Sequence, residues 1–339
     1  MNLSSEIART AFQARISGVG SYLPTITLTN SDLERMVDTS NEWILERTGI
    51  QKRHVCPSSE TTSDLALRAA QAALSKAQLS PQDLDAIIVA TVTPDQPLPS
   101  TACFLQAKLG CRQIMAFDVV AACSGFLYSM NIAHDFIRAG TYRHILVVGA
   151  ETLTRMVNYQ DRQSCILFGD GAGAVVISKT QSSESSSCIM SSQSVSSGAF
   201  TDILQVSAGA SRFPVTIERL EARQNLIEMQ GREVFKSAVQ FLRDTCLEAL
   251  NKAGLTVEDV DWFLIHQANL RIIEAVAKQL KIPIEKIPSN IREVGNTSSA
   301  SIPILMSEKI EDGTLQRGQV ILMAAFGAGL TSAATILRY

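Results

Sequence analysis

The sequence predicts an α/β fold made of two similar halves, and three observations support this prediction. Residues 72–90 and 248–266 each indicate a helix, a turn and an apolar strand, with seven identities at a constant offset of 176. The interval from Cys123 to the next Gly-Thr pair equals the interval from Asn296 to its Gly-Thr pair, at 17 residues. Apolar strands also alternate with helical stretches, which favours parallel or mixed sheets buried between layers of helices.

The predicted elements follow one another in the order that such a repeat requires. In the first half, AFDVVAACSGFLYSMNIAHDFI indicates a strand, a small-residue turn and a helix, and HILVVGA indicates the next strand. In the second half, DWFLI and QVILMAAFG are the corresponding apolar strands. We therefore expect the two halves at residues 1–180 and 206–339. A Ser-rich connection is expected over residues 181–205, with SSESSSC at 182–188 as a surface loop.

Composition and charge exclude several classes of protein. The chain has 339 residues and is 46% hydrophobic, which is enough for a large core. A net charge of -3 and a pI near 5.9 lack the basic excess of a nucleic-acid-binding protein. The first 25 residues contain no continuous apolar stretch, and the most apolar segments of the chain are too short to span a bilayer. We expect a cytoplasmic protein without a nucleic-acid or membrane partner.

One of the seven cysteines has a context suited to catalysis. The odd number and the absence of a CxxC pair disfavour a disulfide framework and a structural zinc site, so no metal is expected. Cys123 lies at the turn before a predicted helix, where backbone N–H groups and the helix dipole lower the pKa of a thiol. Its neighbours Ala121, Ala122 and Gly125 permit close approach of a substrate, although they would also suit tight packing of a helix on a sheet.

Two further residues occupy repeat-related positions. His266 follows the apolar strand DWFLI, and Asn296 lies in EVGNTSSAS. A histidine at a strand end is often a buried core residue, and Asn296 could be only a helix N-cap. Pseudo-symmetry between the halves would nevertheless bring both residues and Cys123 to one centre. The three together therefore predict a Cys-His-Asn catalytic site.

At these residues the chain resembles beta-ketoacyl-ACP synthase III, the initiating condensing enzyme of the dissociated fatty-acid pathway. The similarity runs nearly end to end, through DTSNEWILERTGI, AACSGF, FGDGAGAVV, IHQANLRI, VGNTSSAS and AFGAGLT. A Cys-His-Asn trio distinguishes this family from elongating synthases, which have a Cys-His-His pattern. The resemblance implies a duplicated thiolase-like fold, with two pseudo-symmetric halves and mixed sheets in an α/β/α/β/α layering.

The resemblance also implies the reaction. Cys123 would take a short acyl group, with acetyl expected, from coenzyme A. His266 and Asn296 would hold the thioester carbonyl of malonyl-ACP during a decarboxylative Claisen condensation. The products would be 3-ketoacyl-ACP, CO2 and CoA, which initiates fatty-acid synthesis. No metal or organic cofactor is expected, because two hydrogen-bond donors stabilise the enolate and the CoA thioester is a substrate.

Further contacts carry over from the family position by position. The backbone N–H groups of Cys123 and Ala328 would form an oxyanion hole. The expected coenzyme A contacts are Trp43, Arg47, Arg162, Phe235, Asn269 and Arg271. The expected acyl pocket contains Phe326 and, from the second subunit of a homodimer, Leu98. The expected contacts to acyl carrier protein are Lys236, Arg271, Lys278 and Lys281.

Three positions depart from the family pattern, and one glycine-rich motif superficially resembles a phosphate-binding loop. Many relatives have a glycine in place of Ala328 and a tryptophan in place of Ser332, and some have a phenylalanine in place of Leu98. Alanine at position 328 keeps the backbone N–H that the oxyanion hole needs. Leucine at position 98 leaves the choice of acyl primer open. The segment FGDGAGA lacks the Gly-Lys-Ser/Thr ending of a phosphate loop, so we interpret its glycines as tight packing beside the site.

Three alternatives remain at this point. A papain-like protease also uses Cys, His and Asn, but AACSGF does not fit its nucleophile signature and the duplication has no place in it. A non-catalytic member of the family is disfavoured because all three site residues are retained. A condensing enzyme of specialised metabolism that uses another acyl acceptor is compatible with the sequence.

Overall fold

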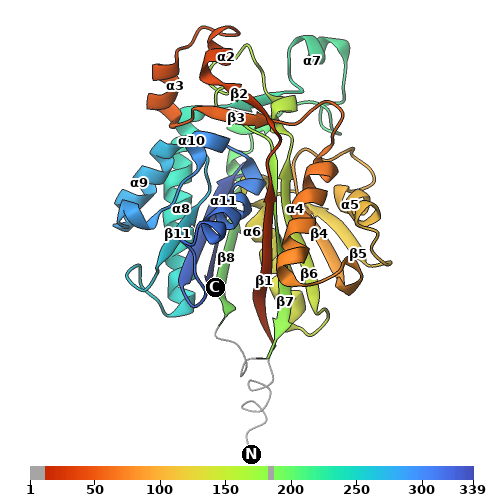
Figure 1. The fold of residues 1–339 in the computed structure, drawn as a ribbon. Coiled ribbons are helices and arrows are strands. Elements are labelled where there is room, and N and C mark those ends of the chain that lie inside the picture. Colours follow the sequence, from red (N-terminus) through yellow and green to blue (C-terminus); the bar gives the residue numbers. More distant parts are fainter. Residues whose placement is uncertain (1–11, 182–186) are drawn as a thin grey trace, which may run out of the picture.

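The computed structural model describes residues 12–181 and 187–339, and its two largest sheets have related topologies (Figure 1). The first sheet has the strand order β1-β7-β6-β4-β5, and the second has the order β11-β12-β13-β8. The strands of the first sheet are β1 (Gln13–Tyr22), β4 (Ala86–Ala90), β5 (Met115–Val119), β6 (His144–Glu151) and β7 (Gly171–Thr180). Those of the second are β8 (Cys188–Ser196), β11 (Trp262–Ile265), β12 (Val320–Gly327) and β13 (Thr331–Arg338).

The pairing of the strands repeats between the two sheets. Strand β4 runs parallel to β6, which is antiparallel to β7, which is antiparallel to β1. In the same way β11 runs parallel to β12, which is antiparallel to β13, which is antiparallel to β8. Strand β5 adds a further parallel pair at the edge of the first sheet. The predicted duplication with mixed sheets is therefore confirmed.

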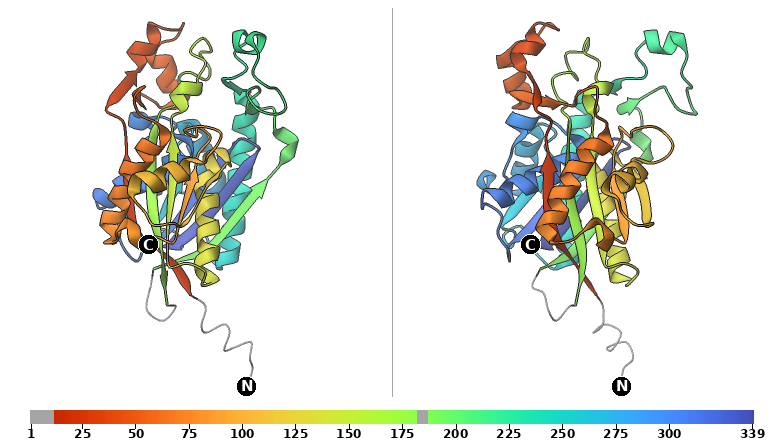
Figure 2. Two further views of the ribbon diagram at one scale, coloured as in Figure 1. Left: turned by 90° about the vertical axis from the view of Figure 1, so that its right-hand side faces the viewer. Right: turned by 45° about the vertical axis from the view of Figure 1, so that its right-hand side comes forward.

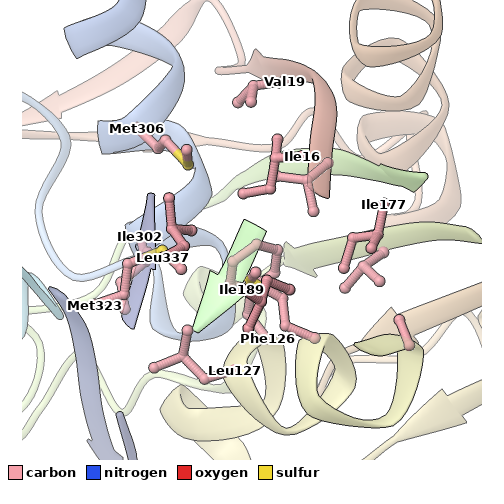
Figure 3. Close-up of a cluster of buried hydrophobic side chains, with 14 of the residues drawn as sticks. Ile16, Val19, Phe126, Leu127, Ile177, Ile189, Ile302, Met306, Met323 and Leu337 are labelled. Atoms are coloured by element: carbon pink, nitrogen blue, oxygen red, sulfur yellow. The ribbon is translucent and has the colours of Figure 1, made fainter. Parts of the chain in front are cut away.

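The helices form three layers around the two sheets (Figures 1 and 2). Helices α4 (Thr62–Ala77) and α5 (Thr101–Leu109) pack with the outer face of the first sheet, and α8 (Gly231–Ala253) and α9 (Leu270–Leu280) pack with that of the second. Helices α6 (Gly125–Arg138) and α11 (Ser301–Glu311) lie between the sheets. Figure 3 shows this central core, where side chains of α6 and α11 meet those of strands from both sheets. The predicted α/β/α/β/α layering is thus confirmed.

Smaller elements cover the end of the sheets at which β4, β6, β11 and β12 finish (Figure 1). An apolar cluster joins this cap to the loops beneath it. Its elements are β2 (Ile26–Thr29), α2 (Asn30–Glu34), α3 (Asn41–Thr48), β3 (Lys52–Val55), β9 (Leu204–Val206), α7 (Ile217–Glu221), β10 (Ile227–Met229) and α10 (Ile291–Val294). Among the residues described, no helix combines the length and the apolarity that crossing a membrane requires.

The expected connection over residues 181–205 is shorter than predicted. Strand β8 occupies 188–196 of this stretch and forms the edge of the second sheet through β13. Its alternating burial hides one face against the core, a pattern that the Ser-rich composition obscured. Residues 182–186 of the predicted surface loop lie outside the described residues. The second half therefore includes β8 and does not begin at residue 206.

The register of the repeat also differs from the expected one. The turns before α6 and α11 begin at Ala122 and Ser298, with φ values of +46° and +49°, so the offset of 176 persists there. The counterpart of Cys123 is therefore Ser299, and Asn296 lies three residues before it. The two equal intervals of 17 residues wrongly paired Cys123 with Asn296. Helix α6 has 14 residues and α11 only 11, so the Gly-Thr pairs that follow these helices are offset by three residues from the rest of the repeat.

Candidate active site

A cavity of about 630 Å³ opens beneath the cap, and residues from both halves line it. Cys123 comes from the turn before α6, His266 follows β11, and Asn296 follows α10. These residues lie 143 and 30 positions apart in sequence, since the numbering runs from 123 to 266 to 296. The pseudo-symmetric arrangement of the halves brings the predicted trio to one cavity.

Close backbone packing fixes the position of Cys123. A Cβ atom on Gly327, the last residue of β12, would lie 2.6 Å from the backbone N of Cys123, so only glycine fits there. The Ser124 hydroxyl donates to Thr331 O at 3.2 Å, and the Thr331 hydroxyl donates to Ala121 O at 3.0 Å. The turn that carries the thiol is therefore held against the β12–β13 connection from three sides.

The pKa of Cys123 does not follow the expectation from the helix start. Burial raises the pKa of this thiol to about 12, and the Glu151 carboxylate adds to the increase. The nearby Ser298 side chain and the backbone N–H of Cys123 act in the opposite direction without reversing the increase. The raised pKa contradicts the prediction of a lowered one, because local sequence shows the helix start but not the tertiary contacts that partly bury the thiol.

His266 is neutral at physiological pH. Its side chain is 3% exposed, and burial lowers the pKa of the imidazole to about 3. The ring Nδ1 lies 2.6 Å from the Ser301 hydroxyl, whereas Nε2 has no hydrogen-bond partner within the described residues. His266 also lines the cavity, and Nε2 is its ring nitrogen without a partner among the described residues.

The Asn296 amide is held with its nitrogen free to donate. Asn296 N–H donates to Leu167 O and Gly169 N–H donates to Asn296 O, each at 2.9 Å. The side-chain Oδ1 accepts a hydrogen bond from Ser298 N–H at 2.9 Å. This contact fixes which end of the amide faces away from the loop, so that Nδ2 remains as the available donor.

The glycine-rich segment FGDGAGA packs against this loop. A Cβ atom on Gly169 would lie 2.6 Å from Val294 O, and one on Gly173 would lie 2.7 Å from Ile304 N. These approaches require glycine and leave no room for a phosphate. The interpretation of these glycines as packing beside the site is confirmed.

Aromatic and basic side chains surround the rest of the cavity. The Arg162 guanidinium lies 4.9 Å from the ring centroid of Trp43, and that of Arg47 lies 5.5 Å from it. The Arg271 guanidinium lies 5.8 Å from the ring centroid of Phe235. All five residues line the cavity, and Phe326 and Asn269 do so too.

Asn269 also has a structural task that the sequence did not reveal. Its Oδ1 accepts a hydrogen bond from Arg271 N–H at 2.9 Å and so caps α9. Its Nδ2 donates to Arg47 O at 3.0 Å, which ties α9 to α3. Both ends of the amide are therefore engaged within the chain.

Five predicted site residues are not among those that line the cavity. Leu98 is 82% exposed on its own chain. Ala328 follows directly after Gly327, which does line the cavity. Lys278 and Lys281 lie about 10 and 15 Å along α9 from Arg271, and Lys236 is exposed near the start of α8.

Five buried residues near the trio were not predicted as site residues. Glu151 is fully buried and accepts hydrogen bonds from the hydroxyls of Ser298 and Ser299 at 3.1 and 3.0 Å. Thr93 donates to it at 2.7 Å, and burial raises the pKa of this carboxyl. Ser301 contacts His266. The serines stand in the motif VGNTSSAS, which marked the segment as functional without indicating which hydroxyl meets which partner.

The structure accommodates Ser332, which departs from the family tryptophan. Ser332 is fully buried, and its hydroxyl lies 2.9 Å from that of Thr245. The ring of Phe241 packs beside Phe326, with ring centroids 6.0 Å apart. Paired hydroxyls and a second aromatic ring therefore pack near Phe326, which lines the cavity. Within the described residues, no cluster of His, Cys, Asp and Glu side chains could hold a metal ion.

The chain is similar to known proteins over most of its length. Residues 117–209 match the family described as 3-oxoacyl-[acyl-carrier-protein (ACP)] synthase III, and residues 250–339 match its C-terminal family. A beta-ketoacyl-[acyl-carrier-protein] synthase III from Caldanaerobacter subterraneus is 48% identical over 326 residues, which cover 96% of this chain and 98% of the relative.

Solved structures extend the likeness to the fold. The crystal structure of 3-oxoacyl-[acyl-carrier-protein] synthase III from Aquifex aeolicus is 46% identical, with a TM-score of 0.89 over 96% of this chain and all of that one. A priming beta-ketosynthase of a polyketide pathway is 33% identical, with a TM-score of 0.89 over 97% of each chain. The papain-like alternative is therefore excluded. The chain belongs to the beta-ketoacyl-[acyl-carrier-protein] synthase III family.

Proposed function

We propose that the chain initiates fatty-acid synthesis by decarboxylative Claisen condensation of a short acyl-CoA with malonyl-ACP. The observation that carries the proposal is the junction of a thiol, a neutral imidazole and a free amide N–H at one cavity. Such a set can hold an acyl group and stabilise an enolate. The products are 3-ketoacyl-ACP, CO2 and CoA.

In the first step, the Cys123 sulfur attacks the acyl-CoA thioester. The thiol gives up its proton, and the departing CoA sulfur gains one, so that one thioester replaces another of similar energy. We assign the oxyanion hole to the backbone N–H groups of Cys123 and Ala328. The contact of Gly327 with Cys123 N supports this assignment, because it sets the β12–β13 connection directly beside the nucleophile.

In the second step, malonyl-ACP loses CO2 and leaves negative charge on its thioester oxygen. Nε2–H of His266 and the Nδ2 group of Asn296 donate hydrogen bonds to this enolate. The loss of one such donor costs about 3–4 kcal/mol in the barrier, or a factor of about 100–1000. A neutral imidazole is suited to this role because its one ring N–H can donate without a positive charge being buried.

In the third step, the enolate carbon attacks the carbonyl of acyl-Cys123. A C–C bond forms, the C–S bond to Cys123 breaks, and the sulfur leaves as a thiolate that is reprotonated. We propose that no metal or organic cofactor takes part, because the two donors and the oxyanion hole match the charge that develops at each step. Coenzyme A enters as part of the substrate.

Coenzyme A is proposed to lie along the aromatic and basic wall. Trp43 and Arg162 would hold the adenine between them, and Arg47, Asn269 and Arg271 would contact the phosphate or pantetheine parts. In the free protein the Arg162 guanidinium covers the indole, so adenine must separate the two. The ion pair of Arg162 with Asp38 is 3.8 Å long and exposed, so it opposes this movement only weakly. Phe235 and Phe326 are proposed walls of the tunnel and acyl pocket.

Acyl carrier protein is the proposed partner at the rim of the cavity. Lys236, Arg271, Lys278 and Lys281 are exposed and positive, and would attract an acidic protein surface. Lys278→Glu combined with Lys281→Glu should raise the KM for malonyl-ACP and leave the KM for malonyl-CoA unchanged. An equal rise with both donors would argue against a carrier-protein contact.

We further propose a homodimer in which Leu98 enters the acyl pocket of the partner. Leu98 is 82% exposed and Val120 is 77% exposed, and Val120 directly follows the edge strand β5. Large exposed apolar side chains beside an unpaired edge are typical of a surface that another chain covers. A sedimentation measurement that found a fully active monomer would contradict this. The proposed location of the enzyme is the cytoplasm.

One experiment tests the central proposal. Purified protein is incubated with acetyl-CoA, digested, and searched for an acetyl adduct by mass spectrometry, with Cys123→Ala and Cys103→Ala as paired variants. The adduct should disappear only with Cys123→Ala, and addition of malonyl-ACP should then yield 3-ketoacyl-ACP in the other samples. An adduct on another cysteine would overturn the assignment of the nucleophile.

A condensing enzyme of specialised metabolism is the second candidate. The likeness to the priming beta-ketosynthase of a polyketide pathway favours keeping it. A panel of acyl-CoA primers, with malonyl-ACP and malonyl-CoA as donors, separates the two. Strong preference for a long or unusual primer, or for a donor other than malonyl-ACP, would favour the second candidate.

A further inference from the structure

The two ring nitrogens of His266 have different surroundings. Nδ1 lies 2.6 Å from the Ser301 hydroxyl, and both side chains are buried, with 3% and 1% exposure. Nε2 has no partner within residues 12–181 and 187–339. A neutral imidazole carries one proton, and that proton decides whether the nitrogen at the cavity donates or accepts.

The hydrogen bonds of Ser301 indicate where that proton lies. Ser301 is the first residue of α11, yet no side-chain hydrogen bond caps this helix, so the hydroxyl is not used there. Its oxygen accepts a hydrogen bond from Gln267 N–H at 3.4 Å. Among the described residues, His266 Nδ1 is the single recorded acceptor for the Ser301 proton. The hydroxyl therefore donates to Nδ1, and the ring proton is on Nε2.

The opposite tautomer, with the ring proton on Nδ1, leaves more buried polar groups without a hydrogen-bond partner. If Nδ1 carried the proton, the Ser301 oxygen would accept from both Nδ1–H and Gln267 N–H, and its own buried proton would have no recorded acceptor. Nε2 would then present a lone pair to the cavity, where an enolate oxygen would be repelled. Buried polar hydrogens without a partner are disfavoured.

We propose that Ser301 is a positioning residue that holds His266 as the Nε2–H tautomer, so that the imidazole donates to the reacting thioester oxygen. Its effect on rate rests on the proposed function, whereas its effect on the tautomer does not. Ser301 lies 35 positions from His266 in sequence and contacts its ring at Nδ1.

The tautomer is measured directly by ¹⁵N NMR on protein labelled in its four histidines. The spectrum of His266→Asn identifies the signals of His266, because a bare and a protonated ring nitrogen have well separated shifts. Wild type should show Nε2 protonated and Nδ1 bare. Ser301→Ala should shift both signals toward an averaged or Nδ1–H state. Unchanged signals in Ser301→Ala would overturn the proposal, whether or not the protein condenses acyl groups.

Kinetics then separate positioning from a general structural role. Ser301→Ala should slow malonyl-ACP decarboxylation about 10- to 100-fold, by analogy with the loss found when the hydrogen-bond partner of a metal-ligating histidine is removed. Acylation of the enzyme by acetyl-CoA should stay near wild type. Ser301→Thr, which keeps a hydroxyl, should recover most of the decarboxylation.

Matched variants guard against a folding effect. Ser307 is also buried on α11, at 2% exposure, and lies outside the site, so Ser307→Ala should leave both half-reactions unchanged. If Ser301→Ala does not fold, Ser301→Cys preserves the volume with a weaker donor and should show the same NMR shift in smaller degree. Equal loss of acylation and decarboxylation in a folded Ser301 variant would show a structural role and refute the proposal.

Discussion

The pH dependence of acylation tests how Cys123 is activated. Burial raises the pKa of its thiol to about 12, so about one thiol in 10⁵ is ionised at pH 7. The charged form is the nucleophile, and its fraction rises about tenfold with each pH unit below the pKa. Transfer of an acetyl group to Cys123 should therefore become about 100-fold faster from about pH 7 to about pH 9.

A single-turnover experiment measures this rate without the later steps. Protein and saturating acetyl-CoA are mixed at each pH, quenched with acid, and the acetylated fraction is read from the intact mass. His266→Ala should show the same slope, because burial lowers the pKa of His266 to about 3 and its ring does not titrate in this range. A rate that levels off at or below about pH 8 would refute the reasoning, since it would mean that the helix start outweighs burial and stabilises the thiolate.

Further outcomes are expected. His266→Ala and Asn296→Ala should each lose about 100-fold or more in malonyl-ACP decarboxylation while acylation persists; slow acylation with normal decarboxylation would contradict the division of roles. Gly327→Ala should melt at a lower temperature and acylate slowly, because its Cβ would lie 2.6 Å from Cys123 N; wild-type values for both would contradict the packing argument. Leu98→Phe should move primer preference from butyryl- and isobutyryl-CoA toward acetyl-CoA, and an unchanged ranking would remove Leu98 from the pocket. Lowering the pH from about 6.5 to about 4.5 should reduce the free energy of unfolding by about 2–3 kcal/mol through His266. The pKa of His266 is about 3 in the folded chain and near 6.5 in the unfolded chain, so the unfolded chain takes up the proton first. In urea titrations, His266→Gln should lack most of this loss of stability.

Much of the fold was predictable because it repeats. The seven identities at an offset of 176 revealed the duplication, and apolar strands between helices indicated buried mixed sheets. The same reasoning failed at β8, an edge strand of the second sheet, because its serines hide the strand pattern and one of them, Ser191, is buried in place of an apolar residue. It also failed for the counterpart of Cys123, because a difference of three residues between α6 and α11 does not show in a spacing count.

The sequence by itself determined the α/β class, the duplication and the identity of the three residues at the cavity, since each depends on periodicity or on a short motif. Only the tertiary structure decided the protonation of these three residues and the direction of their hydrogen-bond donors. Burial raises the pKa of Cys123 and lowers that of His266, and the segments that bury them are distant in the chain. The donors at Asn296 and His266 are likewise set by Ser298 and by a serine 35 positions away. A linear pattern specifies which groups are present, whereas their charge and direction depend on which neighbours the fold brings within a few ångströms.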